Sequence, residues 1–254
     1  MLELRSVSWK SRRGFEIRNV SLALQKGSLT CVMGPNGAGK STLLRLMTGE
    51  IMPDSGEALM DGVSISRISR REFARKAAVI RQERSFAFPM TCRELVMTGR
   101  APYLGFMGLS GKREQEMALR VMEKTGSLLL ADAPFEEISG GEKQRVLLAR
   151  SLMQQPETLL MDEAFSAMDA RQSVNAMQLV KRLAREEQMA VMCIIHDIHL
   201  AHAFADRIVL MDAGEIAADG APDEIMTGEA MKILTGMEIS LSDGRLSTFI
   251  PREG

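Results

Sequence analysis

The feature that most constrains the fold is the segment at 34–42, GPNGAGKST, which fits the phosphate-binding pattern G-x-x-x-x-G-K-[ST]. An apolar run of strand type at 29–33 precedes it, and a helical pattern that Gly49 can close follows it. In a strand, glycine loop and helix arranged in this order, backbone N–H groups and a helix N-terminus surround phosphate oxygens. A glycine-rich turn without a ligand would not explain these flanking elements, so the sequence predicts a nucleotide site.

The residues of this loop have separate expected roles. Lys40 carries a positive charge to the β- and γ-phosphates, and the Ser41 hydroxyl is suited to Mg²⁺. The glycines allow successive N–H groups to point inward at the phosphates. The predicted nucleotide-binding residues are Gly34, Pro35, Asn36, Gly37, Ala38, Gly39, Lys40, Ser41 and Thr42.

Two carboxylates, Asp162 and Glu163, follow an apolar strand predicted at 158–161. In a parallel sheet the carboxyl ends of the strands share one edge, so this pair is expected to face the crevice beside the glycine loop. Asp162 is suited to Mg²⁺, directly or through water, and Glu163 to polarising an attacking water. The alternative, an acidic pair that caps a helix, leaves the loop without a second magnesium residue.

A second group, Ser139, Gly140 and Gly141, opens a helix predicted at 142–154. A serine hydroxyl and bare N–H groups at a helix N-terminus can bind phosphate. The same residues can equally form a helix cap with no ligand. On this pattern alone both interpretations stay open.

Composition limits the function classes. The 254 residues fit one large domain, or a domain with an insertion. Lys and Arg number 32 against 33 Asp and Glu, which gives no electrostatic case for nucleic acid as a partner. Three cysteines without paired spacing indicate a reducing compartment. With no signal peptide and no apolar run of about 18 residues, we expect a cytoplasmic protein that meets a membrane only through a partner.

The pattern of elements predicts an α/β fold in two parts. Residues 2–9 and 17–24 read as strands, the second half-buried and antiparallel. Residues 83–137 carry helix signals, including the capping box Thr91-x-x-Glu94. We therefore predict one domain over 1–254. An α/β core with an antiparallel β part and a C-terminal tail is assigned to 1–82 and 156–254, and an inserted helical subdomain to 83–155.

Six ordered motifs carry a family resemblance. The chain resembles the ATP-binding subunits of ABC transporters over nearly its whole length. The resemblance implies a P-loop NTPase fold with a RecA-like core and Mg²⁺-dependent ATP hydrolysis, with ATP and Mg²⁺ as ligands. The motifs are Walker A (34–42), the Q-loop Gln82, the signature (139–144), Walker B (159–163), the D-loop (166–169) and the switch His196.

The same resemblance implies roles for single residues. Glu163, His196, Gln82 and Lys40 would be catalytic, with His196 at the γ-phosphate. Ser41, Gln82 and Asp162 would hold Mg²⁺. The family forms a head-to-tail homodimer in which each ATP lies between Walker A of one copy and Ser139, Gly140 and Gly141 of the other, and Asp169 links the two sites. For the aromatic residue that stacks on adenine, spacing indicates position 11, a serine here, whereas Trp9 is the nearest aromatic.

A narrower resemblance concerns the stretches 88–103 and 196–210, which look like the importers of iron–siderophores, haem and cobalamin. It implies an ATPase on the cytoplasmic face of the inner membrane, bound to integral permease subunits and working with a separate substrate-binding protein. Residues 84–106 would then form the surface that couples to the permease, although Met90, Met97, Tyr103 and Phe106 can equally be ordinary packing. The alternatives are an ABC ATPase of another small-solute transporter and a non-transport ABC ATPase.

Overall fold

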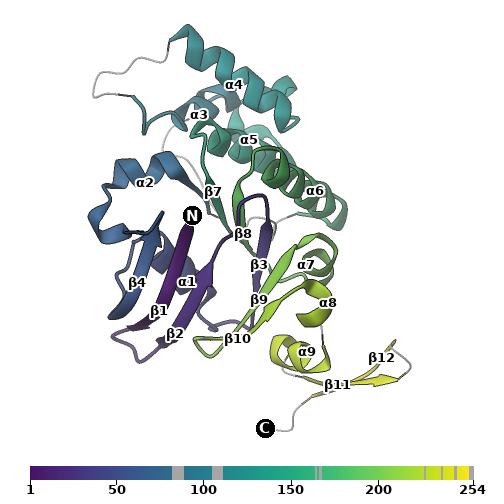
Figure 1. Ribbon diagram of the computed structural model, residues 1–254. Helices are drawn as coiled ribbons and strands as arrows, with labels where there is room; N and C mark the ends of the chain where they lie inside the picture. The colour runs from purple at the N-terminus through teal and green to yellow at the C-terminus, as the bar shows by residue number, and fades with distance from the viewer. Residues whose placement is uncertain are drawn as a thin grey trace.

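The computed structural model describes residues 1–81, 89–104, 111–163, 165, 168–225, 227–235, 237–242 and 245–251. Gln82, Phe88, Phe106 and the first two D-loop residues, Ser166 and Ala167, lie outside the described residues. Two sheets and a group of helices make up most of the described chain (Figure 1).

The first sheet is antiparallel, in the order β2-β1-β4-β5, as the alternation at 17–24 predicts. Along β2 the side chains of Ile17, Val20 and Leu22 are buried, whereas Arg18 and Ser21 are exposed. One face therefore lies on the core and the other meets solvent. Its strands are β1 (Leu2–Lys10), β2 (Glu16–Ala23), β4 (Ser55–Met60) and β5 (Val63–Ser64).

The second sheet carries the glycine loop. Its order is β10-β9-β3-β8-β7-β6, and all neighbouring pairs are parallel except β9 with β10, which form the predicted hairpin. All five residues of β3 are buried, which is typical of a central parallel strand covered on both faces. The strands are β3 (Leu29–Met33), β6 (Ala77–Ile80), β7 (Thr158–Asp162), β8 (Ala190–Ile194), β9 (Arg207–Asp212) and β10 (Glu215–Gly220).

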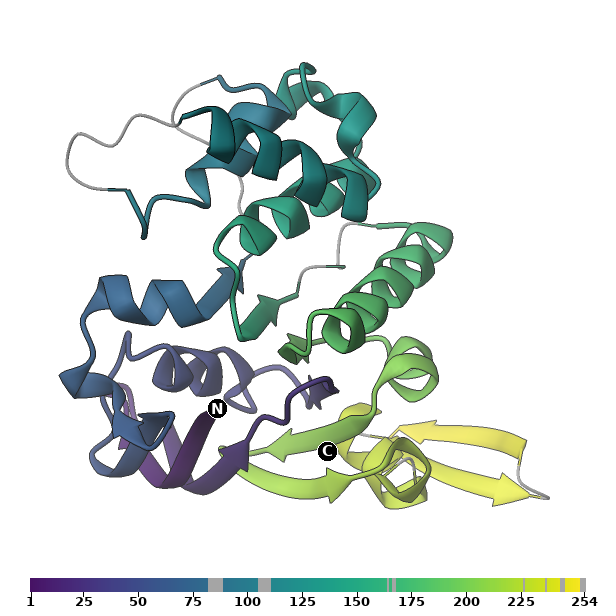
Figure 2. The same ribbon diagram turned by 45° about the horizontal axis from the view of Figure 1, so that its top comes forward.

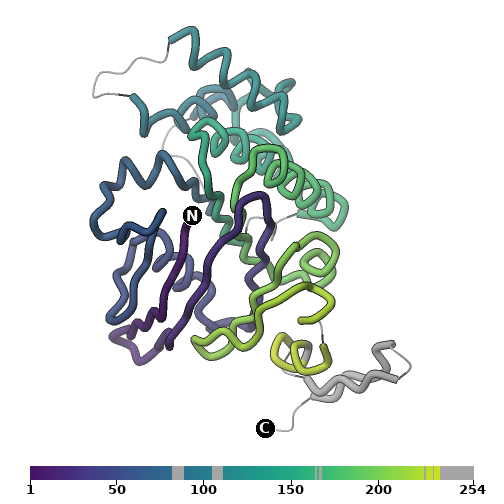
Figure 3. The backbone as a smooth tube through the Cα atoms, in the orientation of Figure 1, coloured from purple at the N-terminus to yellow at the C-terminus, as the bar shows by residue number. Residues whose placement is uncertain are grey.

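The helices begin where the sequence places its caps. Thr91 and Ser139 each form a capping box with the glutamate three residues on, which confirms the predicted box at Thr91. Figures 2 and 3 show α3, α4 and α5 together at one end, away from the antiparallel sheet. The helices are α1 (Lys40–Met47), η1 (Ile65–Arg67), α2 (Arg70–Lys76), α3 (Cys92–Thr98), α4 (Lys112–Lys124), η2 (Leu128–Leu130), η3 (Phe135–Glu137), α5 (Gly140–Met153), α6 (Ala170–Glu186), α7 (Ile198–Phe204), α8 (Pro222–Ile225) and α9 (Gly228–Thr235), with a final hairpin of β11 (Met237–Ser242) and β12 (Arg245–Pro251).

Each face of the parallel sheet lies on its own hydrophobic core. Successive side chains of a strand point to opposite faces, so Cys31 belongs to one core and Val32 to the other. The core that contains Val32 joins the sheet to α1 and to the antiparallel sheet. The core that contains Cys31 joins it to α3, α5 and α6. The glycine loop therefore leaves a strand that is held from both sides.

Tyr103 ties the segment after α3 to the core. Its ring lies between two guanidinium groups, with the Arg100 carbon Cζ 3.9 Å and the Arg75 Cζ 5.3 Å from the ring centroid. Its hydroxyl donates to the Gln154 carbonyl at 2.7 Å. Arg71 also donates to the Pro102 carbonyl, at 2.8 Å. These contacts favour the packing alternative for Tyr103 over a role in coupling.

Tyr103→Phe is expected to lower the free energy of unfolding by about 1 kcal/mol, because it leaves the ring in place and removes the hydroxyl that donates to the Gln154 carbonyl and, at 3.3 Å, to the Arg75 carbonyl. For a chain of this size the melting temperature should fall by about 2–4 °C. ATP hydrolysis measured well below that temperature should not change. Normal stability together with impaired transport would instead support a role for Tyr103 in coupling to the permease.

Candidate nucleotide site

A cavity of about 420 Å³ lies over the glycine loop, within the size range of small-molecule sites. It is built at the carboxyl edge of the parallel sheet, where β3 leads into the loop and β7 ends at Asp162. The structure therefore brings together residues from three separate parts of the chain. The described lining consists of Phe15, Asn36, Gly37, Gly39, Lys40, Ser41, Thr42 and Glu163.

Two glycines of the loop are fixed by close contacts. A Cβ at Gly34 would lie 2.2 Å from the Met211 carbonyl oxygen on β9. Gly39 has a φ of +102° and precedes α1, and a Cβ there would lie 2.7 Å from Ile17 Cδ1. Residues that carry a side chain rarely adopt such positive φ angles, and a Cβ would also clash with β2 or β9. The loop can therefore pass this close to both strands only with glycine at both positions.

Lys40, the first residue of α1, is almost fully buried, and its ammonium group donates to the carbonyls of Gly34 at 2.7 Å and Pro35 at 2.9 Å. Burial lowers the pKa of Lys40, while the charges of Glu163 and Asp162 act in the opposite direction. The positive charge is thus held inside the loop, beside two carboxylates.

Ser41 and Asp162, the two described residues predicted to hold Mg²⁺, lie next to each other. The Ser41 side chain is close enough to lower the pKa of Asp162, and Asp162 Oδ1 is buried without a hydrogen-bond partner among the described residues. Burial raises the pKa of Asp162, the charge of Glu163 raises it further, and Arg81, Ser41 and Lys40 lower it. A carboxylate with an unused buried oxygen beside a hydroxyl fits a hard divalent cation.

Glu163 lines this cavity and pairs with His196, which lines a neighbouring cavity together with Glu163. His196 Nε2 lies 2.8 Å from Glu163 Oε1. The pair forms because β7 and β8 are parallel neighbours, with Asp162 opposite Ile194, so the next residues of both strands emerge at one edge. Glu163 has a φ of +49°, an angle uncommon for residues other than glycine, which turns its side chain out of the strand direction.

Phe15 is the lining residue that sequence reasoning missed. It sits in the turn between β1 and β2, where its N–H donates to Ser11 Oγ at 2.9 Å and its carbonyl accepts from the Ser11 N–H at 2.7 Å. Ser11 therefore closes the turn, and Trp9 packs on the core instead. Neither belongs to the described lining, so Phe15 is a further candidate for the residue that stacks on adenine. The signal was available, because Phe15 is the only aromatic in the segment joining the first two strands.

Phe15→Ala is expected to weaken ATP binding, because a base stacked on an aromatic ring gains about 1–3 kcal/mol. This corresponds to an affinity lower by about 5- to 150-fold, measurable by titration with a fluorescent ATP analogue. Phe15→Tyr keeps an aromatic face and should bind nearly as the unchanged chain does. Equal affinities for the alanine and tyrosine variants would exclude Phe15 as the base platform.

Other predicted residues lie apart from this cavity. Ser139, Gly140 and Gly141 are outside its described lining, and Ser139 caps α5, where its hydroxyl donates to Glu142 Oε2 at 2.7 Å. Asp169 caps α6 by accepting from the Gln172 N–H at 2.8 Å. Gln82 belongs to the residues that are not described. Ser139 therefore forms a helix cap, and its contact with nucleotide stays a prediction.

A buried lysine in a glycine loop, facing two carboxylates across one sheet edge, defines the class of P-loop nucleotide-binding proteins. Within that class, the family model described as ABC transporter matches residues 17–166. The chain therefore belongs to the ABC transporter family, in which it is an ATP-binding and ATP-hydrolysing subunit. None of the described helices has the length and apolar character needed to cross a bilayer.

Individual relatives agree with this placement. The hemin import ATP-binding protein HmuV of Escherichia coli O157:H7 is 39% identical over 229 residues, which cover 88% of this chain and 87% of that protein. The dimeric structure of MJ0796, a bacterial ABC transporter cassette, is 27% identical in sequence, with a TM-score of 0.74. The match covers 87% of this chain and 99% of the MJ0796 chain. A structure described as an inward-facing metal-chelate type ABC transporter shares the fold, with 22% identity, a TM-score of 0.83 and coverage of 99% and 97%.

Proposed function

We propose that this chain is the Mg²⁺-dependent ATPase of an importer for a metal chelate, of the haem, iron–siderophore or cobalamin kind. It works on the cytoplasmic face of the inner membrane, bound to integral permease subunits that receive their cargo from a separate binding protein. The observation that carries the substrate class is the 39% identity to a hemin import ATP-binding protein along most of both chains.

Each site residue has a role in this proposal, and for the described residues the geometry supports it. Lys40 binds the β- and γ-phosphates, and the loop N–H groups orient the triphosphate. Ser41 and Asp162, with Gln82, would hold Mg²⁺, which when bound neutralises phosphate charge. Glu163 accepts a proton from the attacking water, because it lines the nucleotide cavity and its Oε1 pairs with His196. His196 positions Glu163 and reaches the γ-phosphate.

Two copies of the chain complete the site. The cavity of one copy has no described lining residue from 139–141, yet those residues open α5 with N–H groups of the kind that bind phosphate. A second copy placed head to tail brings its Ser139, Gly140 and Gly141 to the nucleotide, and Asp169 joins the two sites. The dimeric structure of the MJ0796 cassette supports the pairing of two copies.

Deletion of the gene for this chain tests the substrate class. The deletion strain should fail to grow when one metal chelate, either haem, a ferric siderophore or cobalamin, is the only supply of the nutrient that this chelate provides. It should still grow when that requirement is met without the chelate. A plasmid with the unchanged gene should restore growth, and the same plasmid with Glu163→Gln should not. Unimpaired growth on all three chelates would overturn the proposed import function without touching the ATPase assignment.

A further inference from the structure

A second cavity, of about 520 Å³, lies at the opposite edge of the parallel sheet from the nucleotide site. Its lining includes Glu157 at the start of β7 and Met189 just before β8, whereas the glycine loop follows the other end of β3. The far wall is α4, which contributes Arg113, Met117 and Arg120. The cavity therefore bridges the helices at one end of the molecule and the α/β core.

The described lining of this cavity is strongly cationic. Two carboxylates, Glu157 and Glu187, face five cationic side chains, which leaves a surplus of three positive charges. This contrasts with the chain as a whole, whose formal net charge is −1. The cationic residues are Lys26, Arg100, Arg113, Arg120 and Lys124.

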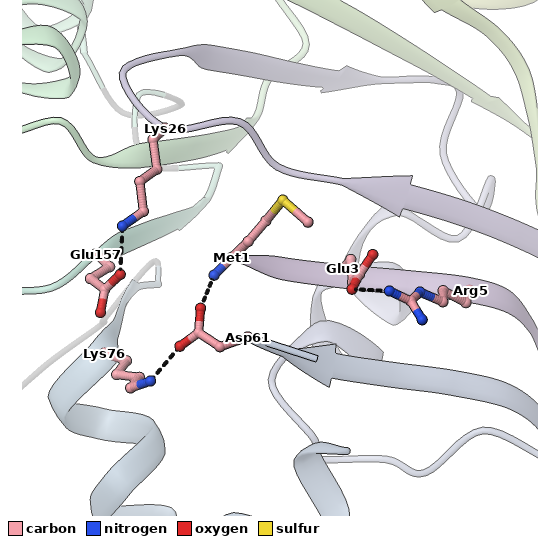
Figure 4. A network of polar contacts seen from close by, with 7 residues as sticks. All are labelled: Met1, Glu3, Arg5, Lys26, Asp61, Lys76 and Glu157. Carbon is pink, nitrogen blue, oxygen red and sulfur yellow. Dashed lines mark hydrogen bonds and ion pairs between the residues drawn. The ribbon is translucent and has the colours of Figure 1, made fainter. Parts of the chain in front are cut away.

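Two of the five cations are already paired. Lys26 Nζ lies 2.8 Å from Glu157 Oε2, and Figure 4 shows these two side chains pointing toward each other. Lys124 pairs with Glu187 in the same way. Both described carboxylates of the cavity are thus paired with lysines, and neither is left to neutralise the charge of the arginines.

The arginines keep unused donors. Among the described residues, Arg113 and Arg120 have no hydrogen bond or ion pair, and both are exposed on the cavity side of α4. They are seven residues apart, which is about two helical turns or 10 Å along one face. Arg100 lies deeper, and its Nε is buried without a hydrogen-bond partner. Guanidinium groups bind phosphate oxygens through two parallel N–H donors.

The floor of the cavity is apolar. Met117 and Val121 from α4 face Leu152, Pro156 and Met189, and methionine side chains adapt to ligands of irregular shape. A free inorganic anion would leave this floor in contact with water, whereas a phosphate ester with an apolar body would cover it. The combination of arginine donors and an apolar floor selects an amphipathic phosphate.

We propose that this cavity binds a small soluble organic phosphate, with its phosphate between Arg113 and Arg120 and its apolar body on Met117 and Val121. Because one wall belongs to α4 and the other to the core, the bound ligand links the two parts. It thereby favours the arrangement seen here, with α5 and its N-terminal Ser139 in their present position. The site shares no described lining residue with the nucleotide cavity.

Calorimetric titration with 1-naphthyl phosphate tests the proposal. The chain used carries Lys40→Ala, so that the glycine loop does not contribute phosphate binding. Adding Arg113→Gln and Arg120→Gln together should weaken the affinity at least tenfold. The matched control, Arg67→Gln with Lys112→Gln, removes the same charge from exposed residues outside the cavity and should change it less than twofold. Glu187→Gln should strengthen binding about threefold, because it removes a carboxylate from the cavity.

Several outcomes would overturn the proposal. These are equal affinities for the two double variants, absence of binding to the Lys40→Ala chain, and weaker binding to Glu187→Gln. Arginine-dependent binding to phosphatidylglycerol vesicles without binding of the soluble ester would also overturn it, in favour of a lipid surface. If the arginine double variant does not fold, the sign of the Glu187→Gln effect decides.

Discussion

Glu163→Gln is expected to bind ATP as tightly as the unchanged chain and to hydrolyse it about 10²- to 10⁴-fold more slowly. Glutamine has the shape of glutamate and can still hydrogen-bond to His196, whose Nε2 lies 2.8 Å from Glu163 Oε1. It cannot accept a proton, so the attacking water loses its base. Binding uses Lys40, Ser41 and the loop N–H groups, which the substitution leaves in place.

Release of phosphate under saturating ATP measures the first effect, and the exposed Glu215→Gln, outside the described lining of the cavity, is the matched control. Because the γ-phosphate then persists, the variant should also accumulate as an ATP-bound dimer on gel filtration, and adding Ser139→Arg should disperse that dimer. Near-normal hydrolysis would exclude Glu163 as the base. A monomer with bound ATP would show that two copies need the permease to align.

Lys40→Ala is expected to abolish measurable ATP hydrolysis and to weaken ATP binding by about 10- to 100-fold, because a hydrogen bond to a charged group contributes about 1.5–3 kcal/mol. The substitution also leaves the Gly34 and Pro35 carbonyls without the ammonium group that now binds them. Some loss of stability should accompany the loss of activity, since both carbonyls belong to the loop itself.

Lys40→Met separates these two effects. Methionine retains an unbranched apolar side chain in a buried position and removes the charge. It should therefore melt closer to the unchanged chain than Lys40→Ala does, while hydrolysis stays absent in both. Lys10→Ala, at an exposed ion pair with Glu16, controls for the loss of a lysine. Retained turnover in Lys40→Met would contradict the role of the charge.

Local patterns predicted most of the fold. The strand before the loop, the box at Thr91, the alternation at 17–24 and the hairpin at 207–218 each depend on residues that are close in sequence, and each is confirmed. The carboxylate pair was also predictable, because the C-terminal end of a parallel strand has a fixed place in the sheet. Such rules need no knowledge of distant contacts.

Long-range contacts were harder to predict. Phe15 reaches the nucleotide cavity because the β1–β2 turn folds over Gly39, and spacing along one strand does not encode that fold. For Tyr103 the sequence left coupling and ordinary packing open, and the contacts with Arg75, Arg100 and the Gln154 carbonyl come from segments that its local pattern does not indicate. The cationic cavity combines α4 with turns more than 60 residues away in both directions, so no single stretch carries its signal.

The burial of β3 on both faces has a consequence for how the molecule denatures. Cys31 belongs to one core and Val32 to the other, so neither core can lose its packing while β3 keeps its place. A slip of β3 by one residue would exchange the two sets of side chains and misfit both layers at once. We therefore expect the two layers to unfold in one cooperative transition. The loop that follows β3 should then open with a free energy close to that of global unfolding, and not with the smaller free energy of a surface segment.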